Sequence, residues 1–307
     1  MLEHFLVVLG QVTTLFLLMG VGFVLAKREK LTLVGTSEMS FLLMYVVTPC
    51  VIIDSFQTEW EESTLRTLAV GTAALAGCYV VYILVSLLFF RKKKPDLQAP
   101  LRFGMIYGNT GFMGLPLVRA VLGEEALIFA VISMVVFNLF SWTHGVMLMG
   151  GRRAFSVKKL FLNPGVIAVT VGLPLFLLRL RLPGPVYSTV GFLGELNTPL
   201  AMVVIGAQMA RADLLSTFRA GELYAASAVK LLLMPTLTAL LLLPLRLAPM
   251  FYAATVILSA APAAGITSMF SERFGRDAAR AAQLVSLSTL LSIATLPVMA
   301  VVAEMLG

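Results

Sequence analysis

The sequence GNTGFMGLP, Gly108 to Pro116, lies inside an apolar stretch that runs from Leu101 to Leu122. Three glycines, an asparagine and a proline stand where a helix needs an unbroken run of hydrogen bonds, so we predict a broken helix. Lipid offers no hydrogen bonds, and broken backbone inside a bilayer must therefore face protein or a water-filled cavity. Secondary transporters build their solute sites in this way. The stretch thus predicts an interior site for a solute.

The composition around this stretch is that of a membrane protein. Of 307 residues, 59% are hydrophobic and 13% are charged, and the mean hydropathy is +0.94. Soluble domains carry about 25% charged residues. No polar interval is long enough for a folded soluble domain. We therefore predict an all-α polytopic membrane protein without an appended enzyme domain.

Apolar runs of spanning length predict ten transmembrane helices. The first ends at Lys27 and Arg28 without a cleavage site, so it is expected to stay in the protein. The predicted spans are 4–26, 37–56, 66–90, 101–122, 126–149, 163–180, 187–210, 221–244, 249–271 and 281–304.

The basic residues predict the orientation. Most of the 23 lysines and arginines fall in loops on one side of the ten spans. Loops rich in lysine and arginine favour the cytoplasmic side, so we predict a cell-membrane protein with both termini on the non-cytoplasmic side. The net charge of +7 comes from short clusters between apolar runs, and this distribution argues against nucleic acid as a partner. The expected surroundings are the lipid bilayer.

The two halves of the chain, 1–150 and 151–307, echo each other. Thr48-Pro49 in span two recurs as Thr198-Pro199 in span seven, and about the same offset carries the first break onto a second Pro/Gly interruption, Ser259 to Gly265. Five spans per half give the halves opposite orientations. This pattern predicts a 5+5 inverted repeat within one membrane domain.

Five motifs resemble the auxin efflux carrier family of membrane permeases. They are NTGFMGLPL (109–117), NTPLAMVVIGAQM (197–209), KLLLMP (230–235), APAAGITSMFSERFG (261–275) and STLLSIATLPV (288–298). The resemblance implies ten helices in a 5+5 inverted repeat, related to the bile-acid/sodium symporters, with broken crossover helices 4 and 9. The family includes plant auxin exporters and bacterial permeases for malonate, malate and similar anions, and the resemblance also implies a homodimer.

The sequence departs from that family in two places. Only Gly150 to Leu162 separates spans five and six, so the long cytosolic loop of the plant carriers is missing. Ile266 stands where many relatives have a polar residue, which weakens the expected substrate contacts of the second break.

A broken helix presents free amides at one end and free carbonyls at the other, with about half a charge of each sign. Free amides bind carboxylates, so segments starting at Leu117 and near Ile266 are expected to bind an organic anion. Carbonyl ends can hold sodium, and coupling to Na⁺ or to H⁺ stays open; no cofactor or metal site is expected. The predicted substrate site is Asn109, Thr110, Gly111, Gly114, Pro116, Thr48, Pro49, Thr198, Pro199, Pro262, Gly265 and Thr267.

Several of these residues have a second interpretation. The amide of Asn109 can cap the broken backbone as well as bind solute. The glycines around it, at small-residue spacing, can serve close helix packing. The two Thr-Pro steps can bend their helices without contacting a solute.

Lys230 lies about ten residues into span eight, where an ammonium is costly and indicates a function or a buried partner. We expect Lys230 to attract the anion or to replace a coupling cation, with Glu195 as the candidate partner. A structural ion pair or a snorkelling side chain is the alternative.

Other polar residues carry weaker predictions. Asp54 and His144 are expected near span ends in solvent. Four residues of spans five and ten can line the cavity or bond across helices: Asn138, Gln283, Ser286 and Ser288. Cys50 and Cys78 lack metal or disulfide spacing.

These observations together predict a secondary carrier of a small organic anion, in which spans one, two, six and seven rock against the other six. No hydrolase or nucleotide motif is present in the sequence, so we expect no enzyme. A channel or sensor using the same pocket, and a sodium symporter of the bile-acid type, are the alternatives.

Overall fold

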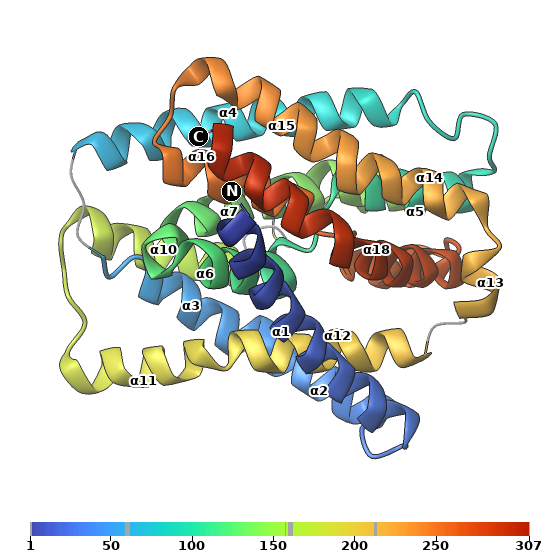
Figure 1. Ribbon diagram of the computed structural model, residues 1–307, viewed down its shortest axis with the longest axis horizontal. Helices are drawn as coiled ribbons and strands as arrows, with labels where there is room; N and C mark the ends of the chain where they lie inside the picture. Colours follow the sequence, from blue (N-terminus) through green and yellow to red (C-terminus); the bar gives the residue numbers. More distant parts are fainter. Residues whose placement is uncertain (1, 59–61, 157, 159–161, 212–213, 307) are drawn as a thin grey trace.

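The computed structural model describes residues 2–58, 62–156, 158, 162–211 and 214–306, and they form a helical bundle (Figure 1). The sole β-pairing among them is a single bridge between Gly108 and Ala263. Seven helical stretches are long and apolar enough to cross a membrane: Leu9–Lys27, Leu33–Ser55, Leu65–Ser86, Glu124–Gly150, Gly184–Arg211, Gly221–Leu245 and Ala278–Leu306. Three shorter apolar helices, Thr110–Leu122, Pro164–Leu177 and Pro249–Ala260, lie in the remaining predicted spans.

The bounds of the α-helices follow the predicted spans closely. They are α1 (Leu2–Lys27), α2 (Leu33–Leu42), α3 (Thr48–Ser55), α4 (Glu62–Ser86), α5 (Pro95–Ile106), α6 (Leu115–Leu122), α7 (Leu127–Phe140), α8 (Val146–Gly150), α10 (Pro164–Leu177), α11 (Gly184–Glu195), α12 (Asn197–Arg211), α13 (Leu214–Phe218), α14 (Gly221–Ala228), α15 (Met234–Leu242), α16 (Pro249–Ala260), α17 (Ile266–Arg273) and α18 (Ala278–Leu306).

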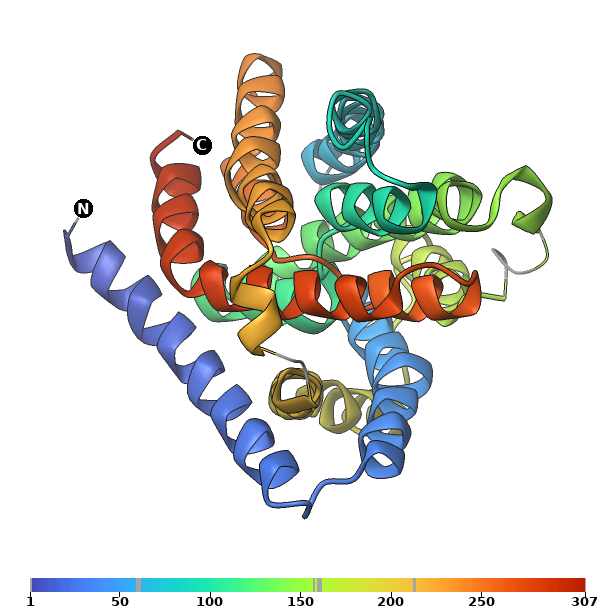
Figure 2. The same ribbon diagram turned by 90° about the vertical axis from the view of Figure 1, so that its right-hand side faces the viewer.

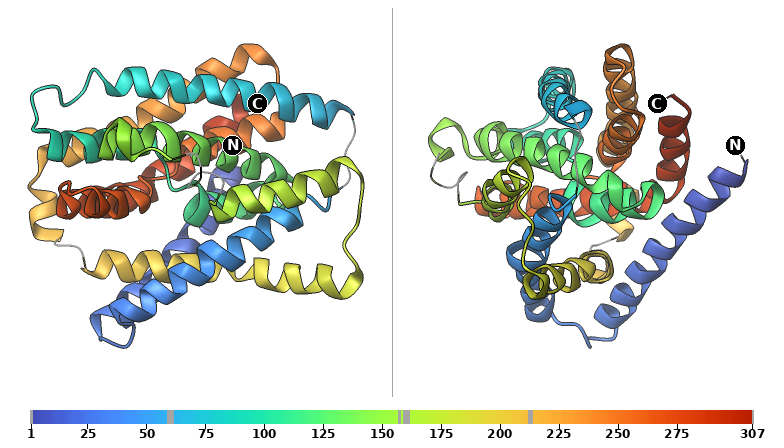
Figure 3. Two further views of the ribbon diagram at one scale, coloured as in Figure 1. Left: turned by 180° about the vertical axis from the view of Figure 1, so that it is seen from behind. Right: turned by 90° about the vertical axis from the view of Figure 1, so that its left-hand side faces the viewer.

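The helices gather in two groups. Figure 2 looks along the long axis and shows α1, α2 and α12 on one side, with α4 and α15 on the other. The view from behind in Figure 3 places α10 and α11 beside α3, and both helices contact it. Spans one, two, six and seven therefore lie together.

The backbones of α1 and α12 come into direct contact. A Cβ added at Gly22 would overlap the carbonyl of Val203, and one added at Gly206 would overlap the carbonyl of Met19. Small residues let helices approach closely, as is common in membrane proteins. Each helix therefore contributes one glycine, and the backbone of the other helix packs against it.

Three spans contain a wide π-helical turn directly before a proline. The turns are η1 (Leu43–Val47), η2 (Thr110–Gly114) and η6 (Val229–Leu233), and the second residue of the following α-helix is Pro49, Pro116 and Pro235 respectively. A proline lacks an N–H and its ring clashes with the carbonyl one turn back, and a wider turn relieves both problems. These prolines therefore do not end their helices.

Span seven is interrupted where the Thr-Pro step predicts a bend. Helix α11 ends at Glu195 and α12 begins at Asn197, with Pro199 in its first turn. The linker from α10 to α11 covers Leu178 to Pro183, which fixes the boundary between spans six and seven.

Candidate functional site

Two broken spans meet in the middle of the bundle. The first breaks between α5, which ends at Ile106, and η2, which begins at Thr110; the second breaks between Ala260 and Ile266. The N–H of Asn109 donates to the carbonyl oxygen of Pro262 over 2.7 Å, and the N–H of Ala264 donates to that of Tyr107 over 3.0 Å. The two interruptions satisfy part of each other's backbone.

The first break is shorter than the sequence predicts. We expected the interruption to extend over Gly108 to Pro116, with amides starting at Leu117. The helix instead resumes at Thr110 and passes through Pro116 by way of the wide turn η2, so the prediction of Leu117 is wrong. At the second break, Ile266 does begin the next helix, α17.

A cavity of about 610 Å³ opens from this meeting point toward one end of the molecule. Its lining extends to Leu33, Arg211, Glu272 and Ala278, at helix ends that lie toward the right in Figure 1. That end carries the basic loops. Deeper lining residues include Thr48, Gly108, Asn109, Thr110, Gly111, Phe112, Asn138, Gln208, Gly265 and Ile266.

Three backbone amides at the breaks are unpaired. Among the residues that the structure describes, nothing accepts a hydrogen bond from the N–H of Gly111, Gly265 or Ile266, and all three residues line the cavity. Gly111 lies in the first turn of η2, and Gly265 and Ile266 lie at the start of α17. The positive ends of two helices therefore face one cavity.

Side chains from the first break add to this surface. Asn109 is 9% exposed, and its Oδ1 accepts from the N–H of Phe112 over 3.2 Å, so it caps the helix. Its amide nitrogen has no partner in the described chain. The buried hydroxyls of Thr48 and Thr110 also lack a described partner. Capping by Asn109 thus leaves its other side-chain atom available.

The other predicted site residues do not line this cavity. Gly114 and Pro116 are buried inside the resumed helix, and Pro262 contributes its carbonyl to the bridge with the first break. Thr267 is buried with an unpartnered hydroxyl directly after the second break. The following also lie outside the lining: Pro49, Thr198, Pro199, Lys230 and Glu195.

Lys230 lies behind the first break and is 1% exposed. Its Nζ donates to the carbonyl oxygen of Ser259 over 2.8 Å. Glu195 is exposed at the end of α11, and no ion pair joins the two within the described chain. The predicted pair between Lys230 and Glu195 is absent because a backbone carbonyl at the end of α16 takes the place of the carboxylate.

Two polar residues of α12 were not singled out from the sequence. Gln208 lies beside Gly265, since a Cβ added there would be 3.9 Å from its Oε1. Arg211 donates to the hydroxyl of Thr36 over 3.0 Å and to the carbonyl of Leu31 over 2.8 Å. Gln208 stands in the quoted motif NTPLAMVVIGAQM, and its spacing of three residues from Arg211 could have indicated a shared face.

The weaker predictions divide. Asn138 lines the cavity, and its Oδ1 accepts from Asn163. Ser288 bonds the second break, because its hydroxyl accepts from the N–H of Ala263 over 3.1 Å. Gln283 bonds across helices to Ser216. His144 is half-buried and pairs with the hydroxyl of Tyr107, so its predicted solvent position is wrong.

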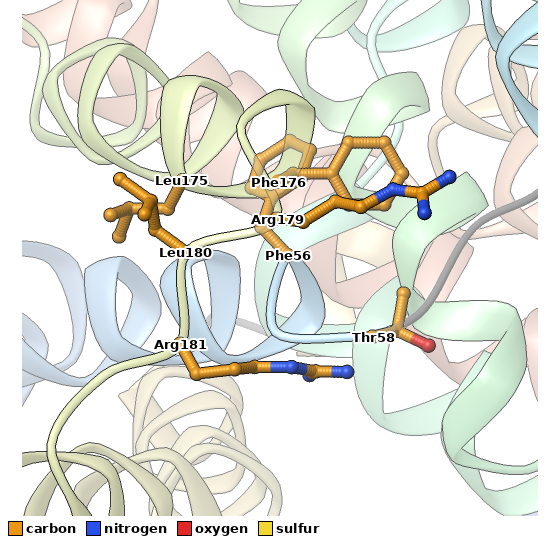
Figure 4. A pocket seen from close by; sticks show the side chains of 7 residues that line it. All are labelled: Phe56, Thr58, Leu175, Phe176, Arg179, Leu180 and Arg181. Atoms are coloured by element: carbon orange, nitrogen blue, oxygen red, sulfur yellow. The ribbon is translucent and has the colours of Figure 1, made fainter.

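A second pocket, of about 300 Å³, lies at the opposite end of the bundle (Figure 4). It is formed where α3 and α10 end, and Figure 4 shows the side chains of Arg179 and Arg181 extending toward the same side as Thr58. No predicted site residue lines it. Nor does any group of three or more His, Cys, Asp or Glu in the described chain have the arrangement of a metal site.

The family model described as Membrane transport protein matches residues 7–158 and 151–300. The chain belongs to this family. The match confirms the resemblance to the auxin efflux carriers, and together with the apolar helices it makes the chain a multi-pass membrane protein of a transporter family.

One curated relative is similar over nearly the whole chain. It is named "Putative malonate transporter", from Rhizobium meliloti (strain 1021). The two sequences are 24% identical over 299 residues, which cover 93% of this chain and 92% of the relative.

Proposed function

We propose that this protein is a secondary carrier of a small organic anion that bears a carboxylate. The observation that carries the proposal is the set of unpaired N–H groups of Gly111, Gly265 and Ile266 in one cavity. Backbone amides at helix starts are a ready site for carboxylates. The amide nitrogen of Asn109 supplies a further donor. The name of the Rhizobium relative supports a carboxylate such as malonate.

The carrier mechanism is alternating access within a ten-helix, 5+5 inverted repeat, in which the two broken spans are the crossover helices. The backbone bridge between Gly108 and Ala263 supports a fixed centre. The grouping of α1, α2 and α12 away from α4 and α15 supports two bodies that rock about it.

The position of the cavity supports one state of the proposed cycle. The basic loops lie at the same end as the mouth, and such loops favour the cytoplasm. We therefore propose an inward-open state of a cell-membrane carrier with both termini outside. The direction of net transport follows from the gradients and not from this state.

A binding screen tests the anion site. The purified protein is heated with and without mono- and dicarboxylates, and we expect carboxylates to raise the midpoint while the matching uncharged amides do not. Asn109→Ala is expected to weaken the shift. Ser292→Ala serves as the control, because the Ser292 hydroxyl donates to the carbonyl of Thr289 in its own helix. A screen in which no carboxylate shifts the wild type contradicts the proposal.

A transport assay then separates a carrier from a channel or sensor. In proteoliposomes, a carrier exchanges labelled malonate against unlabelled malonate on the other side, with saturation. A pore passes label without such counterflow, and a sensor passes none. A sodium symporter of the bile-acid type is distinguished by uptake that requires an inward sodium gradient.

A further inference from the structure

A small polar chamber lies on the far side of the first break from the cavity. Its volume is about 20 Å³, which is room for one water molecule. The lining residues are buried apart from half-buried Ser259. They come from the first break, α4, α5, α7, α16 and the wide turns η2 and η6: Leu75, Tyr79, Tyr82, Ile106, Gly108, Thr110, Ser133, Lys230, Thr255, Leu258 and Ser259.

The wall between chamber and cavity is thin. Gly108 and Thr110 line both spaces. Gly108 has no side chain, and a Cβ added to it would lie 2.7 Å from the Nζ of Lys230. Lys230 therefore stands directly behind the backbone that faces the substrate cavity.

The chamber offers hydrogen bonds that the described chain leaves unused. The hydroxyls of Thr110 and Thr255 are buried without a partner, and both residues line it. An ammonium has three donors, and Ser259 provides the acceptor for one of them. A water molecule among Lys230, Thr110 and Thr255 would satisfy these groups.

The ammonium of Lys230 lies at the C-terminal end of a helix, where the free carbonyls would also bind a coupling cation. Its Nζ bonds to a carbonyl in the last turn of α16, and the C-terminal ends of helices carry partial negative charge. An amine differs from sodium in one respect: it carries a proton through a covalent bond and releases it again.

Charge balance links this amine to the anion. A charge inside the membrane is costly to move, and an ammonium beside a carboxylate group cancels one charge of the anion. The unloaded carrier avoids the same cost when the amine is neutral. Binding of the anion should therefore favour the protonated form of Lys230, and release of the anion should favour the neutral amine.

We propose that the protein is a proton–anion symporter in which Lys230 carries the proton. The inference deepens the proposed function, because it rests on an anion in the cavity and names the coupled ion. A hydronium ion in the cavity gives its proton, by way of the chamber water and the Thr110 hydroxyl, to the Lys230 amine. Water remains in the cavity and an ammonium forms behind the wall. On the opposite side the anion leaves and the ammonium returns its proton to water.

Few other titratable groups face Lys230. Tyr79 and Tyr82 from α4 line the chamber with it, and the hydroxyl of Tyr82 is bonded to Thr238. The hydroxyl of Tyr107 points away to His144 and the carbonyl of Phe140. The chamber residues from α5, α7, α16 and η2 carry no titratable side chain, and no residue of α18 lines it.

Proton uptake on binding tests the proposal. Malonate is titrated into the purified protein at about pH 8, where carboxylates are ionised, in two buffers of different ionisation enthalpy. We expect about one proton taken up per malonate, and an affinity that sodium does not change. Malonate binding without proton uptake overturns the symport but leaves the anion site standing. Absence of any carboxylate binding instead contradicts the proposed function itself.

Two lysine variants assign the proton. Lys230→Met is expected to reduce the uptake to nearly zero, whereas Lys93→Met, a surface lysine 3.7 Å from Glu222, keeps it at the wild-type value. Uptake that persists in Lys230→Met overturns the role of Lys230. If Lys230→Met does not fold, wild-type proteoliposomes decide the coupling: an inward proton gradient should accumulate malonate several-fold, and no accumulation overturns the symport.

Discussion

The two breaks at the centre of this protein satisfy their backbones in different ways. The first is capped by its own side chain, since Asn109 bonds the N–H of Phe112. At the second, Gly265 precedes α17 and supplies no side-chain cap, and the N–H of Ala263 depends on the hydroxyl of Ser288 in α18. The backbone of the first break is therefore stabilised by a side chain of the same segment, whereas that of the second is stabilised by a side chain of another span.

This difference separates two tasks. The first break contributes the side-chain amide of Asn109 to the cavity. It also forms the wall before Lys230, where the hydroxyl of Thr110 is buried. The second contributes backbone amides alone. Loss of the Asn109 amide at the first break should change substrate binding, and loss of the Ser288 hydrogen bond at the second should change stability.

Gly108→Val should have the largest effect. The new side chain meets Lys230 and the carbonyl of Ala261, which lies 3.1 Å from an added Cβ, so the bridge between the breaks must open. Overpacking costs about 1–3 kcal/mol, and malonate transport should be lost. Gly77→Val, with nothing within 4 Å, is the control. Counterflow in proteoliposomes measures both; normal transport by Gly108→Val would mean that the breaks need not touch.

Asn109→Asp should come next. The carboxylate keeps the capping oxygen but places a negative charge beside the proposed anion site, so malonate affinity should fall by about tenfold or more, or about 1.4 kcal/mol. The unfolding midpoint should stay near that of the wild type. Calorimetric titration and thermal unfolding of the same preparation measure the two quantities. Unchanged affinity would mean that Asn109 caps the helix and does not contact the substrate.

Ser288→Ala should have the opposite effect: lower stability with unchanged malonate affinity. The N–H of Ala263 loses its acceptor, and the loss of one such hydrogen bond costs about 1 kcal/mol of stability. Malonate affinity should not change, because Ser288 does not line the cavity. Ser292→Ala is the matched control one turn further along α18. A large loss of affinity in Ser288→Ala would show that the second break also shapes the site.

Gly265→Ala should have the smallest effect. Its φ of −58° suits any residue, and the nearest atom to an added Cβ is Oε1 of Gln208 at 3.9 Å. The N–H that faces the cavity is kept. We expect stability within about 0.5 kcal/mol of the wild type and unchanged affinity, measured as for Asn109→Asp. A strong loss would mean that the methyl group occupies space the anion needs.

The sequence predicted the positions of the spans well because apolar length is a strong signal. It predicted too long an interruption in the first broken span. Proline and glycine propensity count against a helix at each position separately, whereas a wide turn such as Thr110–Gly114 accommodates Pro116 with one shifted set of hydrogen bonds. Propensity contains no information on that alternative.

The site was predictable only where it depends on residue type. Asn109, Thr110 and Gly111 were found because polar and small residues stand out in an apolar run. The partner of Lys230 was missed because it is the carbonyl of Ser259, and any residue has a carbonyl. Thr48 reaches the cavity while its counterpart Thr198 does not, a difference that the symmetry of the sequence cannot express.

The mutual glycine contact of α1 and α12 has a consequence for how the chain is assembled. Gly22 belongs to the first half and Gly206 to the second, so each half on its own carries only one of the two mating surfaces. A polypeptide cut after Gly151 should yield two fragments that are unstable when expressed singly. When the two fragments are co-expressed, they should associate in the bilayer through the contact of α1 with α12 and form the complete bundle.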